Sequence, residues 1–237
     1  MPNASPQADS YLEGPLDVAQ FPETLTARIV TPGPTPRLHG YDVHGDLARH
    51  YDPTDLLLLS LTGELPAQGA SAALRVTLMF FAPLSVQHAS VHAATLARLC
   101  GTTSASTLGV AAIALAEQAR VQLDEHAELL TWLTDRNGSM PARCRPSSAI
   151  GDPGTDRLIA ALGSKVFAFP ELGERPTLTA ALLIVLFGCG LKTRAQMETA
   201  IVTARLPSAM AEAMAEKVTD FDHYPTNLPR YLYREAP

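Results

Sequence analysis

The sequence predicts an all-α fold, and three observations favour it. Charged residues make up only 18% of the 237 residues and aromatic residues only 6%, while alanine is frequent, which is typical of closely packed helices with an aliphatic core. Apolar runs of helical length recur along the chain, and several end at glycine or proline. Two of these runs follow the dipeptide Asp-Pro, a strong signal for the start of a helix.

The N-terminal residues are expected to be largely non-helical. Residues 1–22 mix Pro, Ser, Asn and Asp without periodicity, which predicts a loose arm. Residues 31–36 (TPGPTP) predict a stiff turn, because each proline fixes its own φ and removes a hydrogen-bond donor. The segments on either side, 24–30 and 37–43, are therefore expected to make a short hairpin.

Helices are expected to dominate from Asp46 onward. Asp52 is a predicted N-cap before Pro53 and Asp55, and Gly63 is the predicted end of that helix. Asp152-Pro153 repeats this start after an irregular stretch. The other expected helices cover residues 70–81, 85–100, 107–118, 124–134, 153–162, 177–187, 194–203 and 207–218, and a tail with proline and tyrosine follows at 220–237.

Composition and charge argue against several classes of function. The net charge is −6 without a basic cluster, so nucleic acid is not an expected partner. Three cysteines, far apart, predict neither a zinc ribbon nor a disulfide framework, and no metal is expected. The charge-free stretches 99–116 and 176–191 are interrupted or too short for a bilayer, so no membrane association is expected. Without a signal-peptide pattern, the expected location is the cytoplasm.

Motifs near both ends of the chain resemble the citrate synthase family. Residues 38–43 (LHGYDV) and 55–66 (DLLLLSLTGELP) are similar to the family's Arg-Gly-Tyr segment and its leucine run ending in Gly-Glu-Leu-Pro. Residues 177–191 and 200–216 (AIVTARLPSAMAEAMAE) resemble the family's last pair of helices. Residues 141–158 have the length of the loop that carries Gly-His-Pro and Asp-Pro-Arg. The resemblance runs from Ile29 to Tyr233, and the chain length is nearer to compact citryl-CoA lyase-like members than to full citrate synthases.

The resemblance implies a citrate synthase-like fold, with a large helical domain and a smaller helical domain closing over a cleft. On this basis residues 23–118 form the first part of the large domain, residues 119–203 the small domain, and residues 204–237 the return to the large domain and the C-terminal tail. In the family, an aspartate deprotonates the methyl group of an acetyl-CoA thioester, one histidine stabilises the enolate, and another polarises the keto acid. Arginines bind the carboxylates. The implied substrate is a CoA thioester, and no separate cofactor is expected.

The catalytic positions are where this sequence departs from the family. Residues 116–123 (AEQARVQL) stand where the resemblance places His-Gly-Gly-Ala, and they contain neither histidine nor glycine. Arg145 stands where the second histidine would be, and Gly154 replaces the arginine of Asp-Pro-Arg. The family's aspartate falls near residues 178–180 (LTA), which contain no acid. Only Arg205 keeps its matching place, and the loss of such acid–base groups costs several kcal/mol of reaction barrier.

Four residues are candidates for substrate binding: Arg205, Arg145, Arg143 and His88. Arg205 either lines a pocket or complements the dipole at a helix C-terminus. Arg143 and Arg145 either bind a carboxylate or phosphate or remain solvated loop residues. His88 and His92, at i and i+4, share a predicted helix face and either ligate a metal or stand exposed on that helix.

Two further residues are weaker candidates, and no residue is assigned a catalytic role. Cys144 lies between two arginines, which would lower the thiol pKa if the side chain were exposed, but no histidine nearby could act as its base. His126 is flanked by acidic residues, which indicates a surface position.

The favoured prediction is a citrate synthase-like protein that has lost acyl-CoA/oxo-acid condensation chemistry and acts as a binding, regulatory or partner subunit. A homodimer is expected, with a related citrate synthase-type chain as a further candidate hetero-partner. One alternative is an active acyl-CoA-dependent enzyme with rebuilt catalytic groups, for which Arg145, Arg205, His88 and Asp152 are available. A second alternative is a helical scaffold without a small-molecule site.

Overall fold

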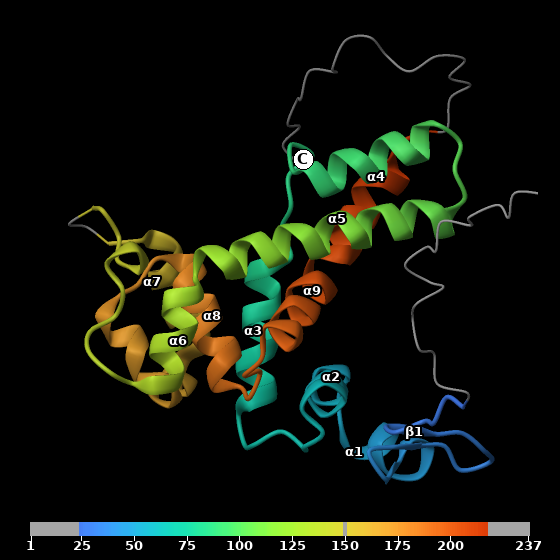
Figure 1. The fold of residues 1–237 in the computed structure, drawn as a ribbon, viewed down its shortest axis with the longest axis horizontal. Coiled ribbons are helices and arrows are strands. Elements are labelled where there is room, and N and C mark those ends of the chain that lie inside the picture. Colours follow the sequence, from blue (N-terminus) through green and yellow to red (C-terminus); the bar gives the residue numbers. More distant parts are fainter. Residues whose placement is uncertain (1–23, 149–150, 218–237) are drawn as a thin grey trace, which may run out of the picture.

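Helices make up most of the chain in the computed structural model, which describes residues 24–148 and 151–217 (Figure 1). The predicted all-α fold is confirmed. The predicted N-terminal arm and the predicted tail at 220–237 lie outside the described residues. The α-helices are α1 (Ala48–His50), α2 (Pro53–Thr62), α3 (Ala70–Phe81), α4 (Ala89–Leu99), α5 (Ser104–Glu125), α6 (Ala127–Asp135), α7 (Pro153–Leu162), α8 (Leu178–Gly188) and α9 (Arg194–Ala215). Three short 3₁₀ segments in the described ranges are η2 (Ala142–Cys144), η3 (Gly163–Ala168) and η4 (Pro170–Glu174).

The predicted N-terminal hairpin is present, with one more strand than expected. Strand β1 (Val30–Thr31) pairs antiparallel with β2 (Arg37–Leu38), which pairs antiparallel with β3 (Tyr41–Asp42). The extra turn lies at His39 and Gly40, whose φ angles are +47° and +85°. Positive φ at both central residues is typical of the tight turns that join two hairpin strands, and it splits the expected second strand in two. A π-helical turn, η1 (Val43–Leu47), follows.

Capping interactions fix the helices whose boundaries the sequence predicts well. The Asp52 side chain accepts hydrogen bonds from the N–H groups of Thr54 (2.7 Å) and Asp55 (3.0 Å), and the Asp55 carboxylate accepts one from the N–H of Asp52 (2.8 Å). This capping box begins α2, and Gly63, with a φ of +80°, ends it. Helices α3 and α7 also have the predicted bounds.

Helices α4, α5 and α9 differ from the expectation. Helix α4 begins at Ala89 rather than Ser85, because residues 85–88 form a turn in which the N–H of His88 donates to the carbonyl of Ser85 (2.9 Å). Helix α5 extends at both ends of the predicted segment 107–118. Helix α9 runs unbroken through Pro207, where the sequence predicts two helices. Both sides of that proline are held by packing, since Ile201 and Ala209 are fully buried.

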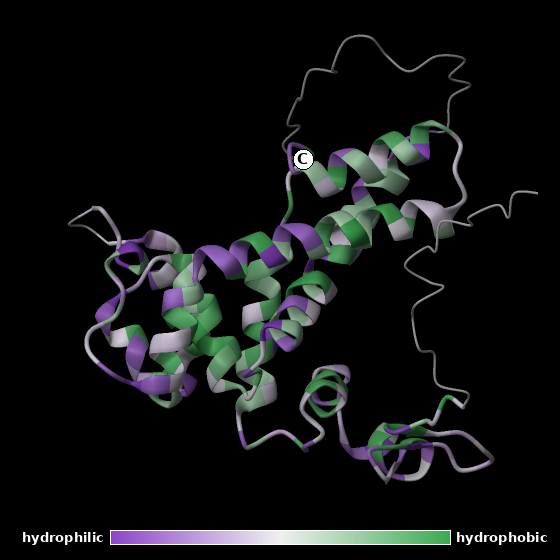
Figure 2. Ribbon diagram, viewed as in Figure 1, coloured by the Kyte–Doolittle hydropathy of each residue, from purple (hydrophilic) through white to green (hydrophobic). Residues whose placement is uncertain are grey.

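The described helices surround two hydrophobic cores. The larger core contains residues of α2, α3, α6, α7 and α8, together with the C-terminal part of α5 and the N-terminal part of α9. Helix α8 is its centre, and Figure 2 shows it as hydrophobic along its length. The smaller core joins α4 to the other parts of α5 and α9. It is formed by Val91, Ala94, Ala111, Leu115, Ala209 and Ala213.

Helices α5 and α9 therefore take part in both cores, and Figure 1 shows them linking α4 on one side to α6, α7 and α8 on the other. The domain boundaries expected at 118/119 and 203/204 stay a prediction. Among the described residues, no helix has both the length and the apolar character that crossing a bilayer requires.

Candidate functional site

The segment expected to replace the family's His-Gly-Gly-Ala, residues 116–123, is the unbroken C-terminal part of α5. Ala119 and Leu123 are buried in the larger core. The opposite face carries ion pairs, in which Arg120 contacts Glu117 at 2.7 Å and Asp124 at 3.3 Å. Both faces of this segment therefore make structural contacts: one face packs in the core, and the other forms ion pairs.

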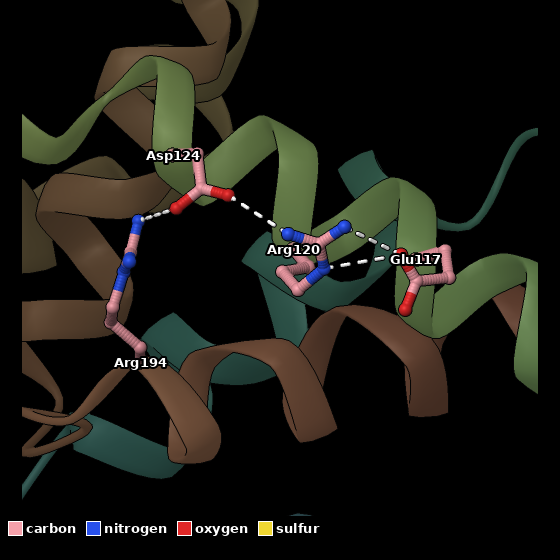
Figure 3. A network of polar contacts seen from close by, with 4 residues as sticks. All are labelled: Glu117, Arg120, Asp124 and Arg194. Atoms are coloured by element: carbon pink, nitrogen blue, oxygen red, sulfur yellow. Dashed lines mark hydrogen bonds and ion pairs between the residues drawn. The ribbon is translucent and has the colours of Figure 1, made fainter.

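The network of ion pairs continues from α5 to α9. Asp124 pairs with Arg194 at the start of α9 while holding Arg120 through its other oxygen (Figure 3). The four side chains form a continuous chain of charges on the outside of the two helices, in the order Glu117, Arg120, Asp124 and Arg194. These polar groups are thus engaged with each other.

Two residues that the resemblance matches to family positions meet at the junction of α7 and α8. Gly154 is buried in the first turn of α7, where the resemblance places an arginine. A Cβ added at Gly154 would stand 2.8 Å from Cδ2 and 3.2 Å from Cβ of Leu178. Leu178 begins α8, in the stretch where the resemblance places the catalytic aspartate. An apolar contact between these two residues therefore fills the space around both positions.

Asp152 holds this junction together. Its side chain accepts hydrogen bonds from the N–H of Gly154 (2.8 Å) and from the N–H of Leu178 (2.7 Å), so one carboxylate caps α7 and ties it to α8. Burial alone would raise the pKa of Asp152, but the hydrogen bonds from Leu178, Gly154 and Thr155 outweigh it and lower the pKa. Both carboxylate oxygens of Asp152 are therefore engaged by backbone N–H groups of the α7–α8 junction.

Arg143, Cys144 and Arg145 lie in and beside η2, next to the same junction. The carbonyl of Cys144 accepts a hydrogen bond from the N–H of Thr177 at 2.7 Å. Arg145 forms an ion pair with Glu174 at 3.5 Å, and Arg143 is exposed. The Cys144 side chain is fully buried, and this burial raises the pKa of its thiol. The idea of an exposed thiol with a lowered pKa is therefore wrong.

Arg205, the residue that keeps its family place, lies on α9 against the end of α3. Its guanidinium carbon is 5.4 Å from the centre of the Phe81 ring. Its Nε is buried without a hydrogen-bond partner, and desolvation by burial lowers the pKa of Arg205. Within residues 24–148 and 151–217, Arg205 forms no ion pair. Arg205 is therefore a half-buried cation without a counter-ion in the described chain.

The histidine candidates lie at the start of α4, within α4 and between α5 and α6. His88 is the exposed N-cap of α4, and its Nδ1 contacts the backbone of Ser85 at 3.2 Å. His88 thus stands at the very start of the helix on which His92 lies, and its carbonyl accepts a hydrogen bond from the N–H of His92 (2.9 Å). Nδ1 of His126 contacts the carbonyl of Gln122 at 2.8 Å. In the described ranges, no group of three or more His, Cys, Asp and Glu residues is placed to hold a metal ion.

The structure thus places the four candidate binding residues in three separate environments. Arg143 and Arg145 lie beside η2, His88 lies before α4, and Arg205 lies on Phe81. Sequence reasoning missed Phe81 and the Gly154–Leu178 contact. A glycine inside a predicted helix was the available signal for that contact, because a glycine there often marks a close approach. Nothing in the sequence around Phe81 marks it as the neighbour of Arg205.

Solved structures share this fold, although no protein-family model and no curated protein sequence matches the chain. Citryl-CoA lyase from Hydrogenobacter thermophilus is 17% identical, with a TM-score of 0.58 over 88% of this chain and 97% of that one. A variant of the ATP citrate lyase from Methanosaeta concilii, in complex with (3S)-citryl-CoA, is 13% identical, with a TM-score of 0.52 over 83% of this chain and 39% of that one.

A second ATP citrate lyase gives a similar result. The enzyme from Methanothrix soehngenii, in complex with citrate and coenzyme A, is 12% identical, with a TM-score of 0.53 over 92% of this chain and 43% of that one. The chain thus spans less than half of the ATP citrate lyases and nearly the whole citryl-CoA lyase. At these identities the likeness concerns the fold, and the chain has the citrate synthase-like helical fold that its motifs predict.

Proposed function

We propose that this chain is a citrate synthase-like protein that binds an organic acid or its CoA thioester without condensing or cleaving it. The Gly154–Leu178 contact carries this proposal, because it fills the space around the positions of an arginine and the catalytic acid with apolar packing. The unbroken α5, without histidine between residues 116 and 123, supports the same reading. The alternative of an active enzyme with rebuilt groups is disfavoured, since Asp152 and Arg145 are engaged in structural contacts.

An assay for free CoA tests the absence of chemistry. The purified chain is mixed with acetyl-CoA and oxaloacetate, and separately with citryl-CoA, while an active citryl-CoA lyase serves as the control. We expect no release of CoA thiol and no cleavage of citryl-CoA above the uncatalysed rates. Turnover in either direction that follows the concentration of this chain would overturn the proposal.

Arg205 is the proposed anchor for a carboxylate. A half-buried guanidinium without a counter-ion gains most from an anion, because pairing compensates the lost hydration of the charge. A ligand at about 100 times its Kd stabilises by about 2.7 kcal/mol, which raises the Tm of a chain of this size by about 5–10 °C. We expect such a shift with at least one of citrate, oxaloacetate, acetyl-CoA and CoA.

Three arginine variants separate specific binding from general charge effects. Arg205→Ala should abolish the ligand-induced shift, whereas Arg49→Ala, which removes an exposed arginine on α1, should leave it unchanged. Arg205→Lys keeps the charge but loses the planar donor fork, so an intermediate shift is expected. An undiminished shift in Arg205→Ala would exclude this residue as the anchor.

We further propose a homodimer formed through α5. The N-terminal half of this helix exposes Leu108, Val110 and Ile113, and Ile113 is 70% exposed. Val110 and Ile113, at i and i+3, lie on the same side of this helix, and exposed apolar side chains gathered in this way indicate a protein contact. The resemblance to citrate synthases also implies dimerisation through helices. Light scattering should give a dimer for the wild-type chain and a monomer for Ile113→Glu.

The matched control for this dimer is Leu25→Glu. Leu25 is 89% exposed but lies before the N-terminal hairpin, far from α5 in the sequence, so this variant should remain dimeric. A monomeric wild-type chain, or a dimer that survives Ile113→Glu, would overturn the proposed interface.

A further inference from the structure

A cavity of about 320 Å³ lies at the end of the larger core remote from the site described above. It opens between the start of α3, the segment η3 and the end of α8. Asp152 marks the opposite end of α7, a helix of 10 residues and therefore about 15 Å long. Ala70, which lines the cavity, and Phe81, which contacts Arg205, likewise mark opposite ends of α3, a helix of 12 residues and therefore about 18 Å long. The cavity is thus separate from the Arg205 region and from the α7–α8 junction.

The walls of the cavity are mostly apolar, and close packing sets their shape. Phe169 is buried and lines the cavity together with Gly188. A Cβ at Gly188 would stand 2.5 Å from Cε1 of Phe169, so glycine allows the ring to lie directly against the end of α8. The neighbouring Cys189 thiol donates to the carbonyl of Ala70 at 3.4 Å, which holds α8 against α3. An aromatic wall on a well-packed base suits the apolar part of a small ligand.

The polar groups that line the cavity carry a net positive charge. Lys165 lines it, together with Gln68 and Ser164, and none of the lining residues is acidic. In the part of the chain that the structure describes, Lys165 takes part in no ion pair. Helix α3 begins at the same cavity with Gly69 as its N-cap, which offers no side chain to the first N–H groups. The partial positive charge of these N–H groups adds to the positive potential of Lys165 in the cavity, by a smaller amount.

We propose that this cavity binds a small organic anion, with its charged group at Lys165 and an apolar body against Phe169. The volume equals that of about ten waters at about 30 Å³ each, so the ligand has about ten non-hydrogen atoms. A lysine ammonium is a point charge that accepts a carboxylate or a phosphate monoester, so the shared feature is one anionic group on an apolar body. This site does not depend on the Arg205 proposal.

Titration calorimetry with simple compounds tests this assignment. The probes are 3-phenylpropionate, phenyl phosphate, the neutral 3-phenylpropanamide and inorganic phosphate. We expect saturable binding of at least one of the two aromatic anions with a Kd near or below ~1 mM, and at least tenfold weaker binding of the amide and of inorganic phosphate. Equal affinity for anion and amide would refute the role of charge, and equal affinity for inorganic phosphate would refute the role of the apolar wall. No saturable binding of either aromatic anion would overturn the site.

Three variants locate the binding. Lys165→Met should weaken the anion at least tenfold, whereas Lys217→Met, the same change at an exposed lysine at the end of the described chain, should leave it unchanged. Ala168→Trp fills the cavity from its exposed rim and should abolish binding, while an unchanged circular dichroism spectrum verifies the fold. Binding that survives both Lys165→Met and Ala168→Trp would overturn the assignment.

Discussion

Replacing Gly154 by alanine should destabilise this chain, although the same change usually stabilises a protein. Where the backbone tolerates it, alanine gains about 0.4–1 kcal/mol over glycine by restricting the unfolded chain. At Gly154 the new Cβ would stand 2.8 Å from Leu178 Cδ2 and 3.0 Å from Asp152 Oδ1, both tighter than ordinary contacts. Overpacking of this kind typically costs about 1–3 kcal/mol. The net result is a loss of about 1 kcal/mol, or about 2–4 °C in Tm.

Urea and thermal unfolding measure this change, and Gly173→Ala is its control. A Cβ at Gly173, in η4, meets nothing within 4 Å, so alanine there should stabilise by about 0.4–1 kcal/mol. Adding Leu178→Ala to Gly154→Ala should relieve the clash, with a coupling free energy of about 0.5–3 kcal/mol. If Gly154→Ala stabilises as Gly173→Ala does, or if the double variant is simply additive, the packing described for the α7–α8 junction is wrong.

Three other predictions concern ionisable groups. The folded-state pKa of Asp152 lies below its ordinary value of 3.8. Its contribution to stability is therefore present above pH 3.8 and is lost as the pH falls through the folded-state pKa. Asp152→Asn should flatten the acid limb of a plot of Tm against pH. Ellman's reagent should label only Cys100 in the native chain and all three thiols in urea, because Cys144 is buried and burial raises the pKa of Cys189 to about 12. Asp124→Asn should lower the free energy of unfolding by less than about 1 kcal/mol, and most of this loss should disappear in 1 M salt, because salt screens exposed ion pairs. A loss that persists in high salt would contradict the solvent-exposed placement of these pairs.

Local signals were sufficient to predict the helices that begin and end at caps. The boundaries of α2 and α7 follow from Asp52, Asp152 and the glycines after each helix, because side-chain caps act over a few residues. The extent of α9 could not be predicted in this way, since burial on both sides of Pro207 outweighs the loss of one backbone N–H.

The candidate site was predictable in what it lacks and less so in what it contains. Motif spacing indicated that residues 116–123 carry no histidine and residues 178–180 no acid, and the printed sequence is enough to establish this. The Gly154–Leu178 contact and the position of Arg205 on Phe81 depend on how distant helices meet. Contacts between distant helices are a property of tertiary packing, so they cannot be predicted from residue spacing or helix propensity.

The passage of α5 and α9 through both hydrophobic cores has a consequence for motion. Helix α5 has 22 residues, so it extends about 33 Å without the interruption at which a hinge could bend. Separating the two cores would require breaking backbone hydrogen bonds in the middle of α5, whereas α9 already lacks one such bond at Pro207, between its larger-core and smaller-core residues. We therefore expect native-state hydrogen exchange to show the central amides of α5 opening together with the rest of the chain, as one cooperative unit rather than as two bodies that swing apart.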